Sequence, residues 1–164
     1  MKLNFCPECS APLHQKTKTE YVCDNGHPYW NNPRTAVAVV LLNNNNEVLY
    51  SKRAHNPKQG LYDFPGGFVD YGETIYEAMT RELQEETGLI AKELTLIHST
   101  AQIYVENTSV CDVVFVTRKW QGQPVPADDV AALEWKPIEF IDSKEFAWGY
   151  SGLVEKLRNF IKEQ

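Results

Sequence analysis

Residues 67–89 constrain the fold of this chain more than any other segment. The segment reads GFVDYGETIYEAMTRELQEETGL and places glycines, an arginine and several glutamates at fixed spacings. Thr74 followed three residues later by Glu77 is the signature of a helix start with a capping box, and Gly88 is the residue type favoured just past a helix end. The segment therefore predicts a helix over about residues 74–87, preceded by a glycine-containing loop.

The predicted helix carries an apolar stripe with acidic residues beside it. The stripe consists of Ile75, Met79 and Leu83. Glu82, Glu85 and Glu86 lie together next to this stripe rather than opposite it. Carboxylates crowded on the core side of a helix repel one another and lose hydration, which is unfavourable unless cations lie among them. Oxygen ligands of this kind suit Mg2+ or Mn2+, which also bind phosphate oxygens.

A solvated acidic helix face is the alternative interpretation, but it leaves the neighbouring glycines unexplained. Pro65, Gly66 and Gly67 form a tight loop just before the helix. Because glycine lacks a side chain, its backbone groups can approach a metal ion or a phosphate closely. The loop and the helix together favour a site that binds metal and phosphate.

The whole segment has the pattern G-x5-E-x7-R-E-L-x-E-E-x-G-L. Its fixed positions are Gly67, Glu73, Arg81, Glu82, Leu83, Glu85, Glu86, Gly88 and Leu89. This pattern resembles the Nudix box at every one of these positions. The resemblance implies an α/β fold, an α/β/α sandwich around a mixed sheet over residues 34–164, and a Mg2+-dependent hydrolase of nucleoside diphosphates linked to another group.

The resemblance also implies roles for single residues. Glu82, Glu85, Glu86 and the backbone carbonyl of Gly67 would bind Mg2+ or Mn2+, and Arg81 would pair with Glu73 to hold the loop. The bound ions would bridge the pyrophosphate and activate the attacking water. Which carboxylate takes the proton from this water stays open. The candidates outside the helix are Asp128, Asp129 and Glu134, with ordinary surface acids as the alternative.

The N-terminus carries a second pattern, Cys6-x2-Cys9 followed by Cys23-x3-His27. Two such half-sites suit a tetrahedral zinc ion, so a structural zinc ribbon is predicted over residues 1–33. His14 or Asp24 as fourth ligand, a redox pair and a site without metal are the alternatives. The absence of a secretory segment and the odd number of clustered cysteines disfavour a disulfide. Cys111 lies in an apolar run and is expected to be a buried small hydrophobe.

The substrate is the least constrained part of the prediction. A zinc ribbon followed by a Nudix domain resembles the NADH pyrophosphatase branch, which implies NADH, NAD or ADP-ribose as substrate. The downstream signature of that branch is absent, and residues 98–109 read HSTAQIYVENTS instead. Two alternative substrate classes stay open, dinucleoside polyphosphates and nucleoside triphosphates. An alternative function, a non-catalytic sensor of ADP-ribose or NAD, also stays open. A sensor would be expected to lose carboxylates of the box, and none is missing here.

Some residues outside the box are candidates for substrate binding. Arg53 and Lys58 precede the catalytic loop and could hold a phosphate, with surface charges as the alternative. Tyr104 lies 16 residues beyond Gly88, which loosely resembles dinucleoside polyphosphate hydrolases, although a tyrosine in a strand more often serves packing. The aromatic residues that could stack on a base are Tyr29, Trp30, Tyr62, Phe64, Tyr104 and Trp148.

Composition limits the partners. The chain has 164 residues and a net charge of −6, so without a basic stripe it is a poor candidate for polymeric DNA or RNA. The longest apolar run, residues 36–42, is too short to span a bilayer. A small nucleotide is the expected partner, a homodimer stays open, and the expected compartment is the cytoplasm.

The remaining pattern alternates strands and helices, as an α/β domain requires. The expected strands cover residues 35–42, 48–53, about 93–105, 110–120 and 132–137. A last helix is expected from about residue 151, with Ser151 as its N-cap. Its apolar face consists of Leu153, Val154, Leu157, Phe160 and Ile161, a pattern that indicates packing rather than chemistry.

Overall fold

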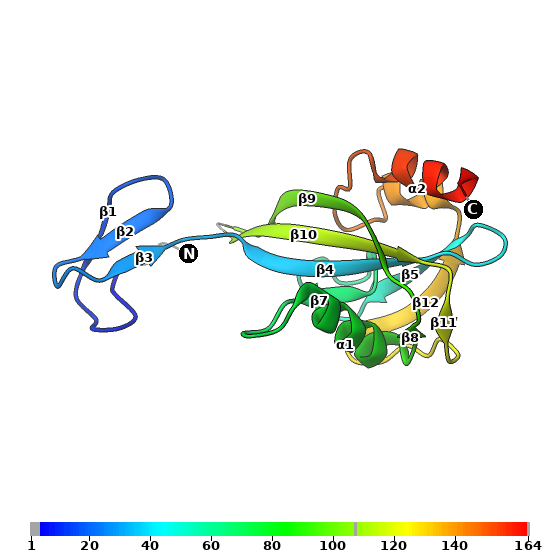
Figure 1. The fold of residues 1–164 in the computed structure, drawn as a ribbon, viewed down its shortest axis with the longest axis horizontal. Coiled ribbons are helices and arrows are strands. Elements are labelled where there is room, and N and C mark those ends of the chain that lie inside the picture. The colour runs from blue at the N-terminus through cyan, green and yellow to red at the C-terminus, as the bar shows by residue number, and fades with distance from the viewer. Residues whose placement is uncertain (1–3, 107, 164) are drawn as a thin grey trace.

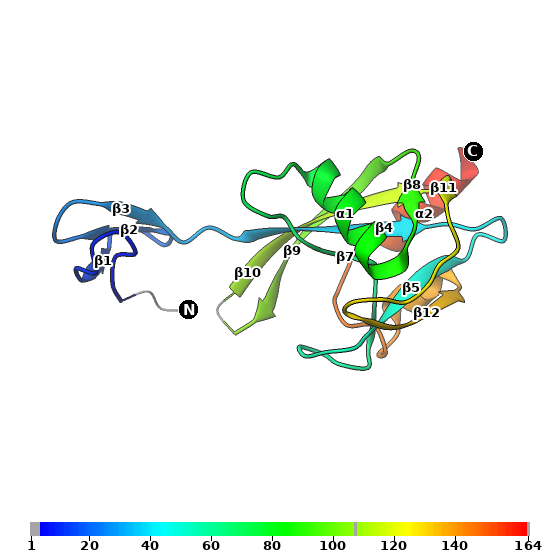
Figure 2. The same cartoon turned by 90° about the horizontal axis from the view of Figure 1, so that it is seen from below.

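The computed structural model describes residues 4–106 and 108–163. Its first part is a small antiparallel sheet of three strands in the order β1-β2-β3: β1 (Leu13–Gln15), β2 (Glu20–Cys23) and β3 (Pro28–Trp30). This sheet lies at one end of the molecule, and an extended segment joins it to β4 (Arg34–Leu41) of the larger part (Figures 1 and 2).

The larger part is built around a four-stranded sheet in the order β7-β4-β10-β9. These strands are β7 (Gly66–Phe68), β4, β10 (Thr108–Thr117) and β9 (Thr95–Val105). Strands β4 and β10 are parallel, whereas β7 pairs with β4 and β9 pairs with β10 in antiparallel fashion. The sheet is therefore mixed, as predicted.

Shorter pieces complete the domain. A second antiparallel sheet has the order β12-β5-β6 and contains β12 (Val130–Lys136), β5 (Val48–Arg53) and β6 (Tyr62–Asp63). A two-stranded ribbon joins β8 (Ile90–Ala91) to β11 (Trp120–Gln121). The 3-10 helix η1 (Ile138–Asp142) was not expected from the sequence.

Two helices cover the two faces of the four-stranded sheet. Alternate residues of β4 enter two hydrophobic cores, because successive side chains of a strand point to opposite faces. Val37, Val39 and Leu41 pack with Met79 and Leu83 of α1 (Ile75–Thr87). Ala38, Val40 and Leu42 belong to the core that includes Leu153 and Leu157 of α2 (Leu153–Lys162). This is the predicted α/β/α sandwich (Figure 1).

The ends of α1 follow their local sequence signals. Thr74 is the N-cap and forms a complete capping box with Glu77. Gly88 adopts a left-handed conformation with φ of 70°, and its amide donates to the carbonyl of Gln84 at 2.9 Å. The predicted helix is therefore confirmed at both ends.

Two predictions about the rest of the chain are wrong. The last helix begins at Leu153, and Gly152 with φ of 82° precedes it in place of a side-chain cap, so Ser151 is not the N-cap. Cys111 is half-buried rather than buried. Within the described residues, no helix is long and apolar enough to cross a membrane.

Candidate active site

Arg81 ties the loop before α1 to the helix. Its Nε and Nη2 atoms donate to the two carboxylate oxygens of Glu73, each at 2.9 Å, and Nη2 also donates to the carbonyl of Phe68 at 3.1 Å. The amide of Asp70 donates to Glu73 at 3.0 Å. The Arg81 guanidinium holds the pKa of Glu73 at about 2, well below its usual value. The expected Arg81–Glu73 pair is present, and it fixes the loop over residues 68–74.

The three glutamates of α1 differ in their surroundings. Arg81 Nη1 donates to Glu82 at 2.8 Å and to Glu85 at 3.2 Å. Glu85 is exposed and Glu82 is half-buried, whereas Glu86 is only 7% exposed and accepts the Gly66 N–H at 2.9 Å. Burial raises the pKa of Glu86 to about 8, against the effect of the Gly66 hydrogen bond. Burial also raises the pKa of Glu82, although Arg81 opposes this shift.

Gly66 and Gly67 lie in strand β7 rather than in the predicted tight loop, and close contacts require glycine at both positions. A Cβ atom on Gly67 would lie 2.6 Å from Oε2 of Glu82, so a side chain there would displace this carboxylate. Gly66 has φ of 151°, and a Cβ atom there would lie 2.8 Å from the Cα of Ala38 in the adjacent strand. The backbone of β7 therefore lies directly against Glu82 and Glu86.

A second loop closes the other side of the glutamates. The amide of Val125 donates to the carbonyl of Thr87 at 2.9 Å, and the amide of Ala127 donates to that of Glu86 at 3.0 Å. These bonds attach the loop to the last turn of α1. Asp128 and Asp129 follow directly and line the same cavity as the glutamates.

The third candidate for proton acceptance, Glu134, does not belong to this site. It lies on β12 and is absent from the lining of the cavity. Its carboxylate accepts the hydroxyl of Tyr62 at 2.5 Å and the ammonium of Lys136 at 2.6 Å. These partners lower its pKa, so Glu134 is a structural acid of the second sheet.

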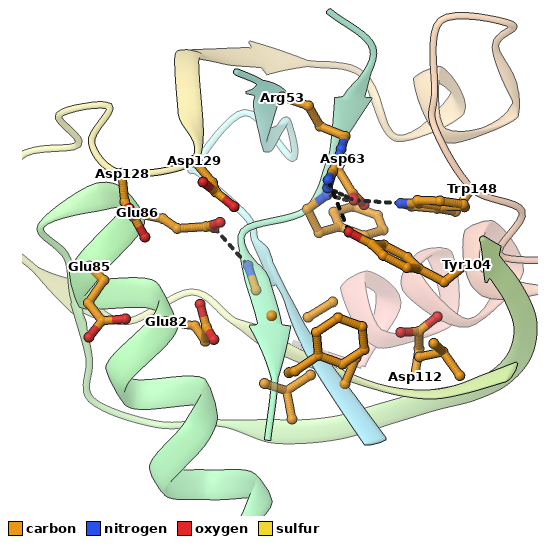
Figure 3. A pocket seen from close by; sticks show the side chains of 18 of the residues that line it. Arg53, Asp63, Glu82, Glu85, Glu86, Tyr104, Asp112, Asp128, Asp129 and Trp148 are labelled. Atoms are coloured by element: carbon orange, nitrogen blue, oxygen red, sulfur yellow. Dashed lines mark hydrogen bonds and ion pairs between the residues drawn. The ribbon is translucent and has the colours of Figure 1, made fainter. Parts of the chain in front are cut away.

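The cavity has a volume of about 320 Å³ and two chemically different ends. The carboxylates of Glu82, Glu85, Glu86, Asp128 and Asp129 gather at one end (Figure 3). Arg53, Asp63, Tyr104, Asp112 and Trp148 lie at the other end, across β7. The two substrate-binding residues predicted from the sequence, Arg53 and Tyr104, are thus both in the cavity.

Asp63 connects side chains at the second end of the cavity through hydrogen bonds. It accepts hydrogen bonds from Trp148 Nε1 at 2.8 Å and from Arg53 Nη1 at 3.3 Å. Arg53 Nη2 donates to the Tyr104 hydroxyl at 3.4 Å, and the Tyr104 and Trp148 rings stack with centroids 5.1 Å apart. The ammonium of Lys58 lies 4.4 Å from the centre of the Trp148 ring. Burial raises the pKa of Asp63 to about 6, against the effect of Arg53.

The other aromatic candidates divide clearly. Phe64 lines the cavity together with Tyr104 and Trp148, whereas Tyr62 packs in the core. Tyr29 and Trp30 belong to the small N-terminal sheet. Only part of the aromatic set predicted from composition is therefore placed to meet a base.

Sequence reasoning missed the polar side chains of the second end: Asp63, Gln102, Asp112 and Tyr150. Asp112 accepts a hydrogen bond from the side-chain amide of Gln102. The sequence did contain a signal for Asp112. Val110, Asp112 and Val114 are alternate residues of one strand, so Asp112 shares the inward face with two valines. A charged residue at such a position is a candidate for function.

The N-terminal sheet brings together the predicted zinc ligands. The ligand atoms of Cys6, Cys9, Cys23 and His27 all lie within 4.8 Å of one another. Cys9 Sγ lies 3.8 Å from Cys23 Sγ, and Cys6 Sγ lies 3.7 Å from His27 Nδ1. All four cysteines of the chain are free thiols. His14 and Asp24, the alternative ligands, instead pair with each other at 2.6 Å.

The family model described as NUDIX domain matches residues 32–157, which is most of the chain. The protein therefore belongs to the Nudix family. It is 49% identical over 109 residues to a protein named ADP-ribose pyrophosphatase from Methanocaldococcus jannaschii. This match covers 65% of the present chain and 62% of the relative, which is less than two thirds of the relative's length.

Solved structures share the fold at low sequence identity. A MutT NUDIX hydrolase from Burkholderia pseudomallei has a TM-score of 0.65 and 23% identity, over 78% of this chain and 98% of its own. The NUDIX domain of Shewanella oneidensis NrtR, complexed with ADP ribose, has a TM-score of 0.65 and 20% identity, over 80% of this chain and 90% of its own.

Proposed function

We propose that this protein hydrolyses a phosphoanhydride bond in a nucleoside diphosphate linked to another group, with ADP-ribose, NAD or NADH as the substrate. One observation carries the proposal. The glutamates of α1 form one end of a cavity whose other end is lined by aromatic and polar side chains. Such a cavity can hold a diphosphate and a nucleoside at the same time. The relative named ADP-ribose pyrophosphatase supports an ADP-linked substrate.

The carboxylate end suits Mg2+ or Mn2+. Its donors are oxygen atoms of Glu82, Glu85 and Glu86, and the Gly67 backbone lies against Glu82. Burial raises the pKa values of Glu82 and Glu86, so a nearby cation would stabilise their ionised forms. When bound, a divalent cation supplies charge neutralisation at phosphate and a water of lowered pKa.

The side chains of this protein would then perform the remaining tasks. Arg81 and Glu73 hold the loop, so the backbone of Gly66 and Gly67 stays in place next to the glutamates. Asp128 or Asp129 would accept a proton from an attacking water, a role that is supported by their position in the cavity lining beside Glu86. At the other end, Arg53 adds positive charge close to the aromatic rings. Lys58, the other predicted phosphate-binding residue, is absent from the lining of the cavity and lies over the Trp148 ring.

We also propose that the N-terminal cluster binds one structural zinc ion and that residues 1–33 form a separate zinc ribbon. A tetrahedral site with Zn–S bonds of about 2.3 Å has sulfur atoms about 3.8 Å apart. The Cys9–Cys23 separation of 3.8 Å fits this geometry. A closed site with four protein ligands is structural, so the zinc would take no part in hydrolysis.

A substrate panel tests the proposed activity. The purified protein is incubated with Mg2+ or Mn2+ and with ADP-ribose, NADH, NAD, diadenosine polyphosphates, nucleotide sugars or nucleoside triphosphates. We expect release of AMP from ADP-ribose or from NAD(H). Turnover of dinucleoside polyphosphates or triphosphates alone would reassign the substrate. Binding of ADP-ribose without turnover of any compound would favour the sensor alternative over the hydrolase.

A further inference from the structure

The floor of the cavity holds a carboxylate that the hydrolytic chemistry does not use. Asp112 lines the cavity on β10, at the end away from the glutamates, and its residue is only 5% exposed (Figure 3). A buried carboxylate is costly unless hydrogen bonds or a counter-charge compensate for the lost hydration. The partners of Asp112 therefore determine what this end of the cavity can bind.

Asp112 has one hydrogen-bond partner among the described residues. The side-chain amide of Gln102 donates to its Oδ2 atom. The two residues are diagonal neighbours across the strand pair, since Asp112 lies opposite Thr100 and Gln102 lies opposite Val110. The other oxygen, Oδ1, receives no hydrogen bond from a described side chain or backbone amide. A carboxylate has about four acceptor positions, so Asp112 retains free acceptor capacity.

The surface around Asp112 is shaped for a flat ring. Ala36 and Ala38 of β4 leave space on the floor, and Val110 adds a second apolar patch. Phe68 and Tyr104 form the adjacent wall, with ring centroids 5.3 Å apart. Aromatic walls and small apolar floors suit the faces of a planar base.

We propose that Asp112, positioned by Gln102, binds the exocyclic amino group of the substrate's nucleobase and so selects amino bases over their keto analogues. The inference rests on the proposed function, which places a nucleoside in this cavity. An ionised carboxylate only accepts hydrogen bonds, so an amino group satisfies it. A keto oxygen at the same place would face the carboxylate oxygen without a proton between them.

The size of the effect follows from the loss of one hydrogen bond to a charged group. Such bonds correspond to about a 10- to 100-fold difference in equilibrium or rate constants. We therefore expect the protein to bind AMP about 10- to 100-fold more tightly than IMP. We expect kcat/KM to be higher for ADP-ribose than for inosine diphosphate ribose by the same factor, because these two compounds also differ by an amino group in place of a keto oxygen.

The test uses the full-length protein and its D112N variant. The affinities of each protein for AMP and IMP, and for CMP and UMP, are measured by titration. Turnover of ADP-ribose and of inosine diphosphate ribose is measured in parallel. Asparagine has nearly the same shape, but its amide can donate to a keto oxygen, so the AMP:IMP ratio should fall to about one or reverse. D142N, which removes an exposed acid outside the cavity, is the matched control and should keep the wild-type ratio.

The outcomes separate this inference from the proposed function. A preference for the amino nucleotide in either pair that is lost in D112N supports the inference, even if neither diphosphate ribose is hydrolysed. Equal binding of both members of both pairs by the wild-type protein overturns it, even if hydrolysis is rapid. Retention of the preference in a folded D112N protein also overturns it. If D112N fails to fold, the wild-type ratios still decide the question.

Discussion

The small N-terminal sheet and the α/β domain are stabilised in different ways. Among residues 4–33 only Cys6 and Cys23 are buried, and both belong to the cluster of four candidate zinc ligands. In the α/β domain, by contrast, β4 is buried on both faces between two hydrophobic cores. The first part has almost no apolar interior, so we expect its fold to depend on the four candidate ligands, whereas the second part buries extensive apolar surface.

We therefore expect most substitutions in one part to leave the stability and activity of the other part unchanged. In the first part the polar cluster is the proposed source of stability. In the second part the polar cluster is the proposed source of activity, and its charges are held by a structure that is stabilised by two hydrophobic cores. Each of the following changes is expected to affect one of the two parts.

The largest expected effect is the removal of zinc. Cys23→Ser should abolish binding of one zinc ion per chain and unfold the N-terminal sheet, because zinc binding by small ribbons is worth about 10–16 kcal/mol. The α/β domain should keep its unfolding temperature. Elemental analysis and limited proteolysis measure the two effects. Cys111→Ser, outside the cluster, is the matched control. Absence of zinc from wild-type protein purified without chelators would contradict the assignment.

The second largest expected effect is a loss of activity with little loss of stability. Glu85→Gln and Glu86→Gln should each lower kcat by at least about 10²-fold, since each removes the charge of a candidate metal ligand. Substrate affinity should fall less, and the unfolding temperature should change little for the exposed Glu85. Steady-state kinetics and titrations measure these effects. Glu134→Gln serves as control and should retain activity, and near-normal activity in both site variants would remove the metal assignment.

A third change tests how the loop before α1 is held. The pKa of Glu73 is lowered from 4.5 to about 2, so its ion pair with Arg81 stabilises the folded state above about pH 5. This stability is lost as the pH falls toward 2. The unfolding temperature of Glu73→Gln should therefore lie below that of the wild type at pH 7, and the gap should narrow between pH 5 and 2. A gap that does not vary with pH would argue against the ion pair, and the exposed Glu145→Gln should show no gap.

The smallest expected effect lies at the start of α1. Thr74→Ala removes the capping oxygen and should lower the free energy of unfolding of the α/β domain by about 1 kcal/mol. Thr74→Ser keeps the oxygen and should be nearly neutral. Chemical denaturation measures both variants. Zinc content should stay at the wild-type level in each, and a change in it would show that the two parts are coupled.

The features predicted best from sequence are the local ones. Thr74, Glu77 and Gly88 set the ends of α1 through contacts within a few residues, so their signals could be interpreted without the fold. The Arg81–Glu73 pair was expected from the resemblance to the Nudix box and is present. Ser151 failed as an N-cap because Gly152 turns the chain just before the helix, and a capping residue type does not fix its own backbone conformation.

The features missed depend on contacts far apart in sequence. Asp63 meets Trp148 across 85 residues, and Glu134 was misplaced because the pairing of β12 turns it toward Tyr62 and Lys136. Asp112 and Gln102 are neighbours because of the register in which β9 pairs with β10. This register shifts at two places along the strands. No spacing rule in a single sequence supplies such a register.

The last turn of α1 connects both walls of the carboxylate end. The side chain of Glu86 accepts a hydrogen bond from the Gly66 amide of β7, while the carbonyls of Glu86 and Thr87 accept from the loop that leads to Asp128 and Asp129. Strand β7 and this loop are therefore both attached to the last turn of α1. The carboxylate end of the cavity is thus assembled around one turn of α1, whereas side chains of the other end come from separate elements, including β9, β10 and the segment before α2. We therefore expect substitutions on those elements to change the shape of the second end without disturbing the carboxylates.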